Sequence, residues 1–196
     1  METNKTRVLS DTKLMTSTVM LCVISIILSV TPLGYIPLGI LNVTIMHIPV
    51  IIAAIVLGRN SAMMVGFTFG MTSLIRSFLV PTPISFVFWN PIVSVLPRIL
   101  IGVFAYYAYE MVKKSTGNKS LSYILSALVG SLTNTIFVLG SIYLLYAKQY
   151  MQASHITGNF LTYLGGIFVA NSIPEAIFAA VVTLAICRAL ERYIKN

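Results

Sequence analysis

Five polar side chains interrupt the long apolar stretches of this sequence and are its best candidates for chemistry: Arg98, Glu175, Asn171, His47 and Asn134. A guanidinium can bind a carboxylate through charge-assisted hydrogen bonds. The imidazole, the two amides and the carboxyl group can exchange hydrogen bonds with hydroxyl and amide groups. The chemistry that this set indicates is the binding of a small polar molecule.

The sequence lacks the patterns that predict catalysis. It contains no H-E-x-x-H, no G-x-S-x-G, no paired carboxylates and no Walker lysine motif. Cys22 and Cys187 lie far apart and outside any C-x-x-C pattern, so they predict neither a disulfide nor a metal site. We therefore expect a protein that is not an enzyme and that needs no metal or cofactor. A chain without a nucleotide-binding domain cannot hydrolyse ATP itself.

The composition places these residues in a membrane protein. Of 196 residues, 57% are hydrophobic and 9% are charged, whereas a soluble domain carries about 25% charged residues. The net charge is +8, but the basic residues sit at predicted helix ends and are not interleaved with aromatic residues. The sequence therefore predicts contact with a lipid bilayer and no binding of nucleic acid.

Apolar runs separated by Gly, Pro and polar residues predict six transmembrane helices. They cover residues 14–30, 43–57, 61–79, 91–111, 121–147 and 164–190. Segment 33–42 contains Gly and Pro and is too polar in its backbone to face lipid alone, so we expect a loop there. The predicted fold is an all-α integral membrane protein with one membrane domain over residues 1–196. It comprises an N-terminal segment 1–13, a six-helix bundle 14–190 and a tail 191–196.

Lys and Arg residues predict the orientation of this bundle, because they are enriched on the cytoplasmic side. With the N-terminus inside, ten of the 13 basic residues are cytoplasmic: Lys5, Arg7, Lys13, Arg59, Lys113, Lys114, Lys119, Arg188, Arg192 and Lys195. Two, Arg76 and Lys148, are outside, and Arg98 lies within the fourth span. The distribution predicts that both termini are cytoplasmic. It also lets the five polar residues reach the outer half of the bundle.

Structural roles would also account for these residues. Arg98 and Glu175 can neutralise each other as a buried ion pair, and His47 can be a packing histidine that bonds a nearby backbone group. Asn134 and Asn171 can form interhelical hydrogen bonds. Trp89, with its aromatic neighbours, can belong to an interfacial belt. The spread of the set over four helices at a similar depth favours a binding site.

Small residues suggest close helix contacts in two places. Thr18, Cys22, Ser25 and Ser29 form a stripe along the first predicted helix. The glycines at 66 and 70 form a G-x-x-x-G pattern in the third. Either feature can pack inside the bundle or face a partner protein, and the sequence leaves both possibilities open.

Several segments together resemble the substrate-binding S components of energy-coupling factor (ECF) transporters. They are 47–54 (His-Ile-Pro-Val-Ile-Ile-Ala-Ala), 66–74 (Gly-Phe-Thr-Phe-Gly-Met-Thr-Ser-Leu), 81–88 (Pro-Thr-Pro-Ile-Ser-Phe-Val-Phe), 97–102 (Pro-Arg-Ile-Leu-Ile-Gly), 132–135 (Leu-Thr-Asn-Thr) and 173–176 (Ile-Pro-Glu-Ala). The first and fourth look most like pantothenate-type members. The resemblance extends from residue 14 to the C-terminus.

The resemblance implies a six-helix bundle in the bacterial plasma membrane, with a vitamin pocket near the outer face that is gated by the first loop. It implies a complex with a membrane coupling protein and two cytoplasmic ATPase subunits. The coupling protein would dock on a small-residue motif of the first helix, usually Ala-x-x-x-Ala. In this sequence the corresponding residues are Thr18, Cys22, Ser25 and Ser29.

The sequence thus predicts the substrate-binding subunit of an ATP-driven vitamin importer, with pantothenate as the expected vitamin. Arg98 would pair with the substrate carboxylate. Its hydroxyl and amide groups would meet Asn134, His47, Asn171 and Glu175, and the loop that ends at Asn42 would cover it together with Trp89.

The alternatives within this class are other small vitamins or precursors, such as folate or a thiamine pyrimidine. Outside it are a membrane enzyme acting on lipid and an assembly subunit whose polar residues only pack.

Overall fold

The computed structural model describes residues 2–31, 34–38, 41–82, 84–154 and 159–195, and of residues 2–11, 35–38, 41–43 and 192–195 it describes the backbone only. Its described elements are α1 (Glu2–Val30), β1 (Tyr35–Leu38), β2 (Leu41–Thr44), α2 (Ile48–Val56), α3 (Arg59–Leu79), η2 (Ser85–Trp89), α4 (Pro91–Ser94), α5 (Leu96–Thr116), α6 (Lys119–Ala153), α7 (Phe160–Ile167), η3 (Phe168–Ser172) and α8 (Ile173–Lys195).

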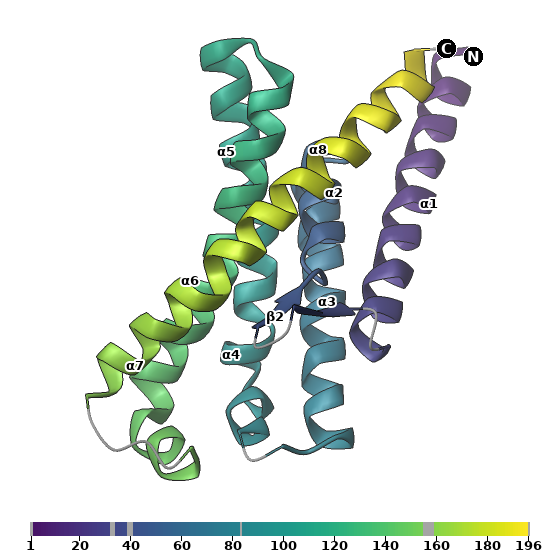
Figure 1. Ribbon diagram of the computed structural model, residues 1–196. Helices are drawn as coiled ribbons and strands as arrows, with labels where there is room; N and C mark the ends of the chain where they lie inside the picture. Colours follow the sequence, from purple (N-terminus) through teal and green to yellow (C-terminus); the bar gives the residue numbers. More distant parts are fainter. Residues whose placement is uncertain (1, 32–33, 39–40, 83, 155–158, 196) are drawn as a thin grey trace.

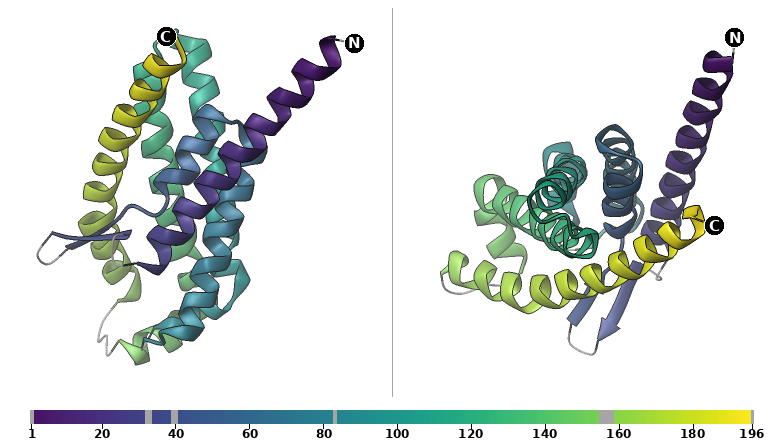
Figure 2. Two further views of the ribbon diagram at one scale, coloured as in Figure 1. Left: turned by 90° about the vertical axis from the view of Figure 1, so that its right-hand side faces the viewer. Right: turned by 90° about the horizontal axis from the view of Figure 1, so that it is seen from above.

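The helices form an antiparallel bundle in which both ends of the chain lie at the same end (Figure 1). Within the described residues, five helical segments are long and apolar enough to cross a membrane: Thr12–Val30, Arg59–Leu79, Pro91–Thr116, Lys119–Ala153 and Phe160–Glu191. Helix α1 packs mainly on α3 and lies at the edge of the bundle, as the view from above shows (Figure 2). The predicted helical membrane fold is therefore present.

The second span predicted over residues 43–57 is not a full transmembrane helix. Strand β2 occupies the start of this segment, and α2 has only 9 residues. At about 1.5 Å per residue it is much shorter than the hydrocarbon core, which is about 30 Å thick. The segment is strongly apolar because α2 is buried among α3, α5, α6 and α8, not because it faces lipid along its length.

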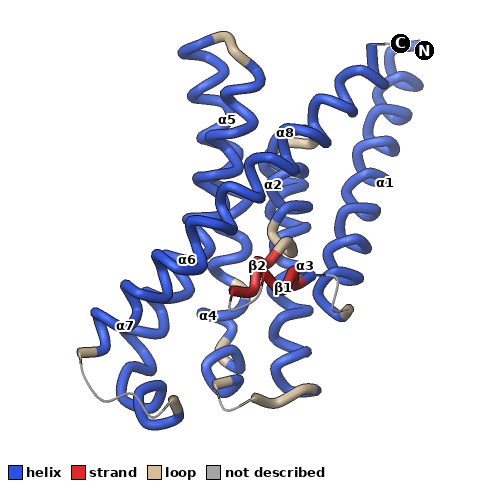
Figure 3. Tube along the Cα trace, viewed as in Figure 1, coloured by secondary structure: helices blue, strands red, loops and turns tan. Residues whose placement is uncertain are grey.

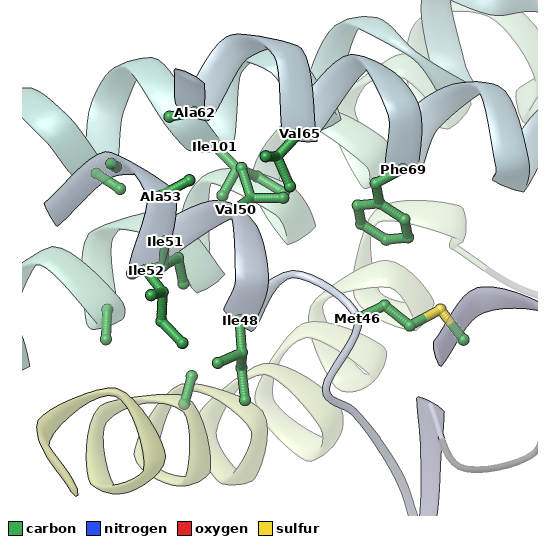
Figure 4. Close-up of a cluster of buried hydrophobic side chains, with 14 of the residues drawn as sticks. Met46, Ile48, Val50, Ile51, Ile52, Ala53, Ala62, Val65, Phe69 and Ile101 are labelled. Atoms are coloured by element: carbon green, nitrogen blue, oxygen red, sulfur yellow. The ribbon is translucent and has the colours of Figure 1, made fainter. Parts of the chain in front are cut away.

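Helix α2 forms the centre of the hydrophobic core. All residues from Ile48 to Ala54 are buried, and Figure 4 shows Val50 beside Val65 of α3 and Ile101 of α5. Pro49 is tolerated because it lies in the first turn, where its missing N–H has no intrahelical partner. A buried α2 fixes the depth of His47, which directly precedes it.

The loop predicted at 33–42 contains an antiparallel β-hairpin, drawn in red in Figure 3. Strands β1 and β2 pair with Tyr35 opposite Thr44 and Pro37 opposite Asn42. Strand β2 contacts η3 and α8. The hairpin therefore follows α1 in the chain and packs against the segment that carries Asn171 and Glu175.

Two further boundaries differ from the prediction. Helix α6 continues past residue 147, the predicted end of the fifth span, to Ala153. The last span is divided into α7, the π-helical turn η3 and α8. A π-turn admits one extra residue per turn and is often found at functional sites.

Glycines allow α3 and α5 to approach each other closely. A Cβ at Gly66 would collide with the backbone carbonyl oxygen of Arg98, and one at Gly70 would lie 2.7 Å from the Cα of Val95. On the opposite helix, a Cβ at Gly102 would lie 2.8 Å from the carbonyl oxygen of Ala62. The G-x-x-x-G pattern therefore packs inside the bundle, and it sets the position of the first turn of α5.

Candidate functional site

Arg98 occupies the first turn of α5, directly after Pro97, and its side chain points into the protein. Only 7% of the residue is exposed. Its Nη1 donates a hydrogen bond of 2.8 Å to the carbonyl oxygen of Val93, and its Cζ lies 5.5 Å and 5.6 Å from the ring centroids of Phe69 and Phe88. These are uncharged groups that stabilise a cation through dipole and cation–π attraction. The guanidinium is therefore held in place with its positive charge.

Arg98 lines a pocket of about 230 Å³ between the end of α3 and the η2 turn. The other polar residues around this pocket are one arginine and four hydroxyl residues: Arg76, Ser73, Ser77, Thr82 and Ser85. Ser77 and Ser85 are buried, whereas Thr82 is exposed. The pocket thus leads from the surface to a buried guanidinium, and its polar lining suits an anion.

His47 and Glu175 form a second polar cluster. His47 Nδ1 lies 3.3 Å from Glu175 Oε1, and 1% and 6% of the two residues are exposed. His47 Nε2 and Glu175 Oε1 have no hydrogen-bond partner among the described residues. Buried polar atoms without a partner cost about 1–3 kcal/mol each, so a ligand that bonds them would offset that cost.

Among the described residues, Glu175 lies within ion-pair distance of His47. The described contacts of Arg98 are with the Val93 carbonyl and the rings of Phe69 and Phe88. The described lining of the Arg98 pocket includes neither His47 nor Glu175. The structure therefore describes one cationic and one acidic polar cluster.

Two amides and two serines add further polar atoms on α6 and η3. Asn134 is half-buried on α6, and its Oδ1 has no described hydrogen-bond partner. Asn171 lies in η3, which contacts β2 and α6. Ser131 and Ser172 are fully buried with partnerless hydroxyls, and the sequence reasoning missed both. Their spacing in the sequence could have identified them, because Ser131 lies one helical turn before Asn134 and Ser172 one helical turn before Glu175.

The aromatic rings described over the Arg98 guanidinium are those of Phe69 and Phe88. Trp89 stacks on Phe78 of α3 at 5.4 Å between ring centroids, and its Nε1 donates a 3.2 Å hydrogen bond to the Ser77 carbonyl. It is 46% exposed, a placement typical of an interfacial aromatic residue. Asn42 lies in β2, and its side chain is outside the part of the structure that is described. The covering role expected of both residues remains a prediction.

The small-residue stripe of α1 faces α3. Thr18 Oγ1 donates a 2.9 Å hydrogen bond to Ser61 Oγ, and Thr68 Oγ1 contacts Cys22 Sγ at 3.5 Å. Ser25 and Ser29 are buried. The face of α1 that is exposed is apolar instead. In this conformation the stripe serves packing within the bundle, and its role in docking a partner stays a prediction.

This placement predicts that Ser25→Trp destabilises the isolated subunit, because an indole cannot fit at a fully buried serine and overpacking costs about 1–3 kcal/mol. The check is the thermal transition of the purified protein in detergent. Met20→Trp, on the exposed face of α1, is the control and should leave the transition unchanged. If Ser25→Trp is as stable as the wild type and only fails to assemble with partners, the stripe is a docking surface.

Within the described residues, no group of three or more His, Cys, Asp or Glu side chains could hold a metal ion. The polar side chains described above are a buried arginine, an acidic residue paired with a histidine, and several hydroxyl and amide groups.

Comparison with known proteins agrees with this architecture. Residues 13–187 match the family model described as "ECF transporter, substrate-specific component". The chain is 33% identical over 168 residues to the "Pantothenic acid transporter PanT" of Lactococcus lactis subsp. cremoris, with 78% of this chain and 80% of the relative covered. It is 32% identical over 197 residues to the "Pantothenate transporter PanT" of Leuconostoc mesenteroides subsp. mesenteroides, with 95% and 93% covered. This multi-pass membrane protein therefore belongs to the family of substrate-specific components of ECF transporters.

Proposed function

We propose that this chain is the pantothenate-binding subunit of an ATP-driven ECF importer. The observation that carries the proposal is the buried Arg98 guanidinium in a polar pocket, beside which the structure holds a buried His47–Glu175 pair as a second polar cluster of the bundle. Pantothenate has a carboxylate at one end, an amide in the middle and hydroxyl groups at the other end, and these two clusters would supply partners for both of its ends. Two relatives named as pantothenate transporters support the same substrate.

Each part of the site has a role in binding. Arg98 would donate a bidentate pair of hydrogen bonds to the carboxylate, a geometry that a planar guanidinium favours. Glu175 and His47 would bond the hydroxyl groups, and Asn134 and Asn171 the amide. The β1–β2 hairpin would cover the ligand, since β2 contacts both η3 and α8. Neither end of this set performs chemistry on the substrate.

Transport then depends on other subunits. The family supplies the vitamin-binding component, and we infer that a membrane coupling protein and two cytoplasmic ATPases complete the complex. Retained substrate gives the direct test of the function. Mass spectrometry of small molecules released from the gently purified subunit should detect pantothenate. Folate or a thiamine pyrimidine in its place would contradict the proposed substrate.

We also propose that both termini lie in the cytoplasm. The turn between α5 and α6, which contains Asn118, lies at the same end as both termini (Figure 1). In a variant whose native cysteines are replaced, Asn118→Cys should resist an impermeant thiol reagent in intact cells. Gln152→Cys, near the other end of α6, should react. Labelling at position 118 with protection at position 152 would indicate the opposite orientation and contradict the proposal.

A further inference from the structure

We propose that the 230 Å³ pocket between α3 and η2 is the carboxylate subsite, and that Arg76 binds the substrate's carboxylate together with Arg98. This inference rests on the proposed function and adds a second specificity-determining residue to it. The sequence placed Arg76 among the outer basic residues, and its position in this pocket comes from the fold.

The pocket has the size of a subsite. Its volume of about 230 Å³ is below the roughly 300–1,000 Å³ of pockets that bury whole drug-sized ligands. It therefore suits one end of a small molecule.

The charges of the pocket point to an anionic group. Both arginines line it, and its described lining residues include no acidic side chain. Ionisable side chains within a membrane are costly and usually face a partner or a polar cavity. A carboxylate placed between the guanidiniums would offset the repulsion between two like charges, and hydroxyls of residues such as Ser73 could add hydrogen bonds to it.

The surroundings of Arg76 keep it at this site. It lies in the last turns of α3, is half-buried, and its Nη1 donates a hydrogen bond to the carbonyl oxygen of Ser29 near the end of α1. A guanidinium carries five N–H donors in a planar fork. The contact with the α1 backbone orients this fork, whose planar shape suits a carboxylate.

Arg76 could have the purely structural role of holding the end of α1 in place. A matched pair of ligands distinguishes that role from carboxylate binding. Pantothenol is pantothenate with a primary alcohol in place of the carboxylate. If Arg76 binds the carboxylate, its loss should affect pantothenate selectively. If it only pins α1, both ligands should be affected alike.

The experiment is calorimetric titration of both ligands into detergent-purified wild type, Arg76→Gln and Arg76→Lys. We expect Arg76→Gln to reduce the preference for pantothenate over pantothenol by at least about tenfold, the scale of one charged hydrogen bond, with pantothenol affinity unchanged. The preference of Arg76→Lys should lie between those of the wild type and Arg76→Gln, because an ammonium keeps the charge but lacks the planar fork of donors. Arg59→Gln is the control, since Arg59 is exposed and bonds Tyr107 away from this pocket.

Unchanged preference in Arg76→Gln, or an equal loss for both ligands, would overturn this inference. Should Arg76→Gln not fold, wild-type preference in Arg76→Lys would overturn it in the same way. If the wild type and Arg76→Gln bind with the same preference while Arg98→Gln loses it, only the role of Arg76 fails. If the wild type binds no pantothenate, the proposed function fails as well.

Discussion

Arg98→Gln is expected to reduce the affinity for pantothenate by at least about thirtyfold, because removing one partner of a buried charge pair costs about 2–5 kcal/mol. Arg98 is 7% exposed and packs against Phe69 and Phe88, so water cannot readily replace its contacts with the ligand. Glutamine retains a hydrogen-bond donor and removes the charge. Arg98→Lys should also bind weakly, since an ammonium cannot reproduce the bidentate geometry.

Calorimetric titration, with the thermal transition of each variant recorded alongside, measures this effect. The control is Lys148→Gln, which removes a positive charge from α6 outside the described pocket. It should leave affinity unchanged. A folded Arg98→Gln variant that binds pantothenate as tightly as the wild type would remove Arg98 from the site. It would also remove the physical reason for preferring an acidic vitamin.

Gly66→Ala is expected to destabilise the bundle and to weaken binding at the same time. The new methyl group would collide with the backbone carbonyl of Arg98, and overpacking of this kind costs about 1–3 kcal/mol. To relieve the collision, α3 and α5 must separate, which displaces the turn that carries the guanidinium. The thermal transition should fall, and pantothenate affinity should fall with it.

Gly140→Ala is the matched control, because nothing lies within 4 Å of a Cβ at that position of α6. Alanine is favoured over glycine in a helix by roughly 0.5–1 kcal/mol, so this variant should be as stable as the wild type or slightly more so. If both variants behave alike, the close approach of α3 and α5 at Gly66 is not what positions Arg98.

The membrane class and most helices could be predicted because helices that cross lipid must be long and mainly apolar. A full-length span needs about 20 mainly apolar residues, and α3, for example, begins and ends within two residues of its predicted bounds. The same signal fails for α2, since hydropathy does not distinguish a helix buried in protein from one exposed to lipid. Its 9 residues are apolar because they fill the core.

The β-hairpin and the π-turn depend on contacts that the sequence does not express locally. Residues 33–42 could be identified as non-helical from Gly and Pro, but the pairing of Tyr35 with Thr44 required the fold. Nothing in the Phe168–Ser172 segment distinguishes a π-turn from an α-helix. These two irregular elements lie beside each other and bring Thr44, Asn171 and Glu175 to one region.

The candidate site follows a similar division. Arg98, His47 and Glu175 could be chosen because ionisable groups rarely lie in apolar segments without a function. Ser131 and Ser172 were not chosen, because serine is common in membrane helices. They become candidates only when the structure shows that their hydroxyls are buried without a described hydrogen-bond partner. Arg76 was assigned to topology because its distance along the chain from Arg98 conceals their shared pocket.

Direct titration of pantothenate into the purified wild-type subunit tests the central claim most directly. Folate and a thiamine pyrimidine serve as comparison ligands in the same detergent. We expect saturable binding of pantothenate by the isolated chain, with one site per subunit and no requirement for ATP or metal. We expect no binding of folate or the thiamine pyrimidine. Binding of either comparison ligand in preference to pantothenate, or the absence of pantothenate binding by a folded protein, would contradict it.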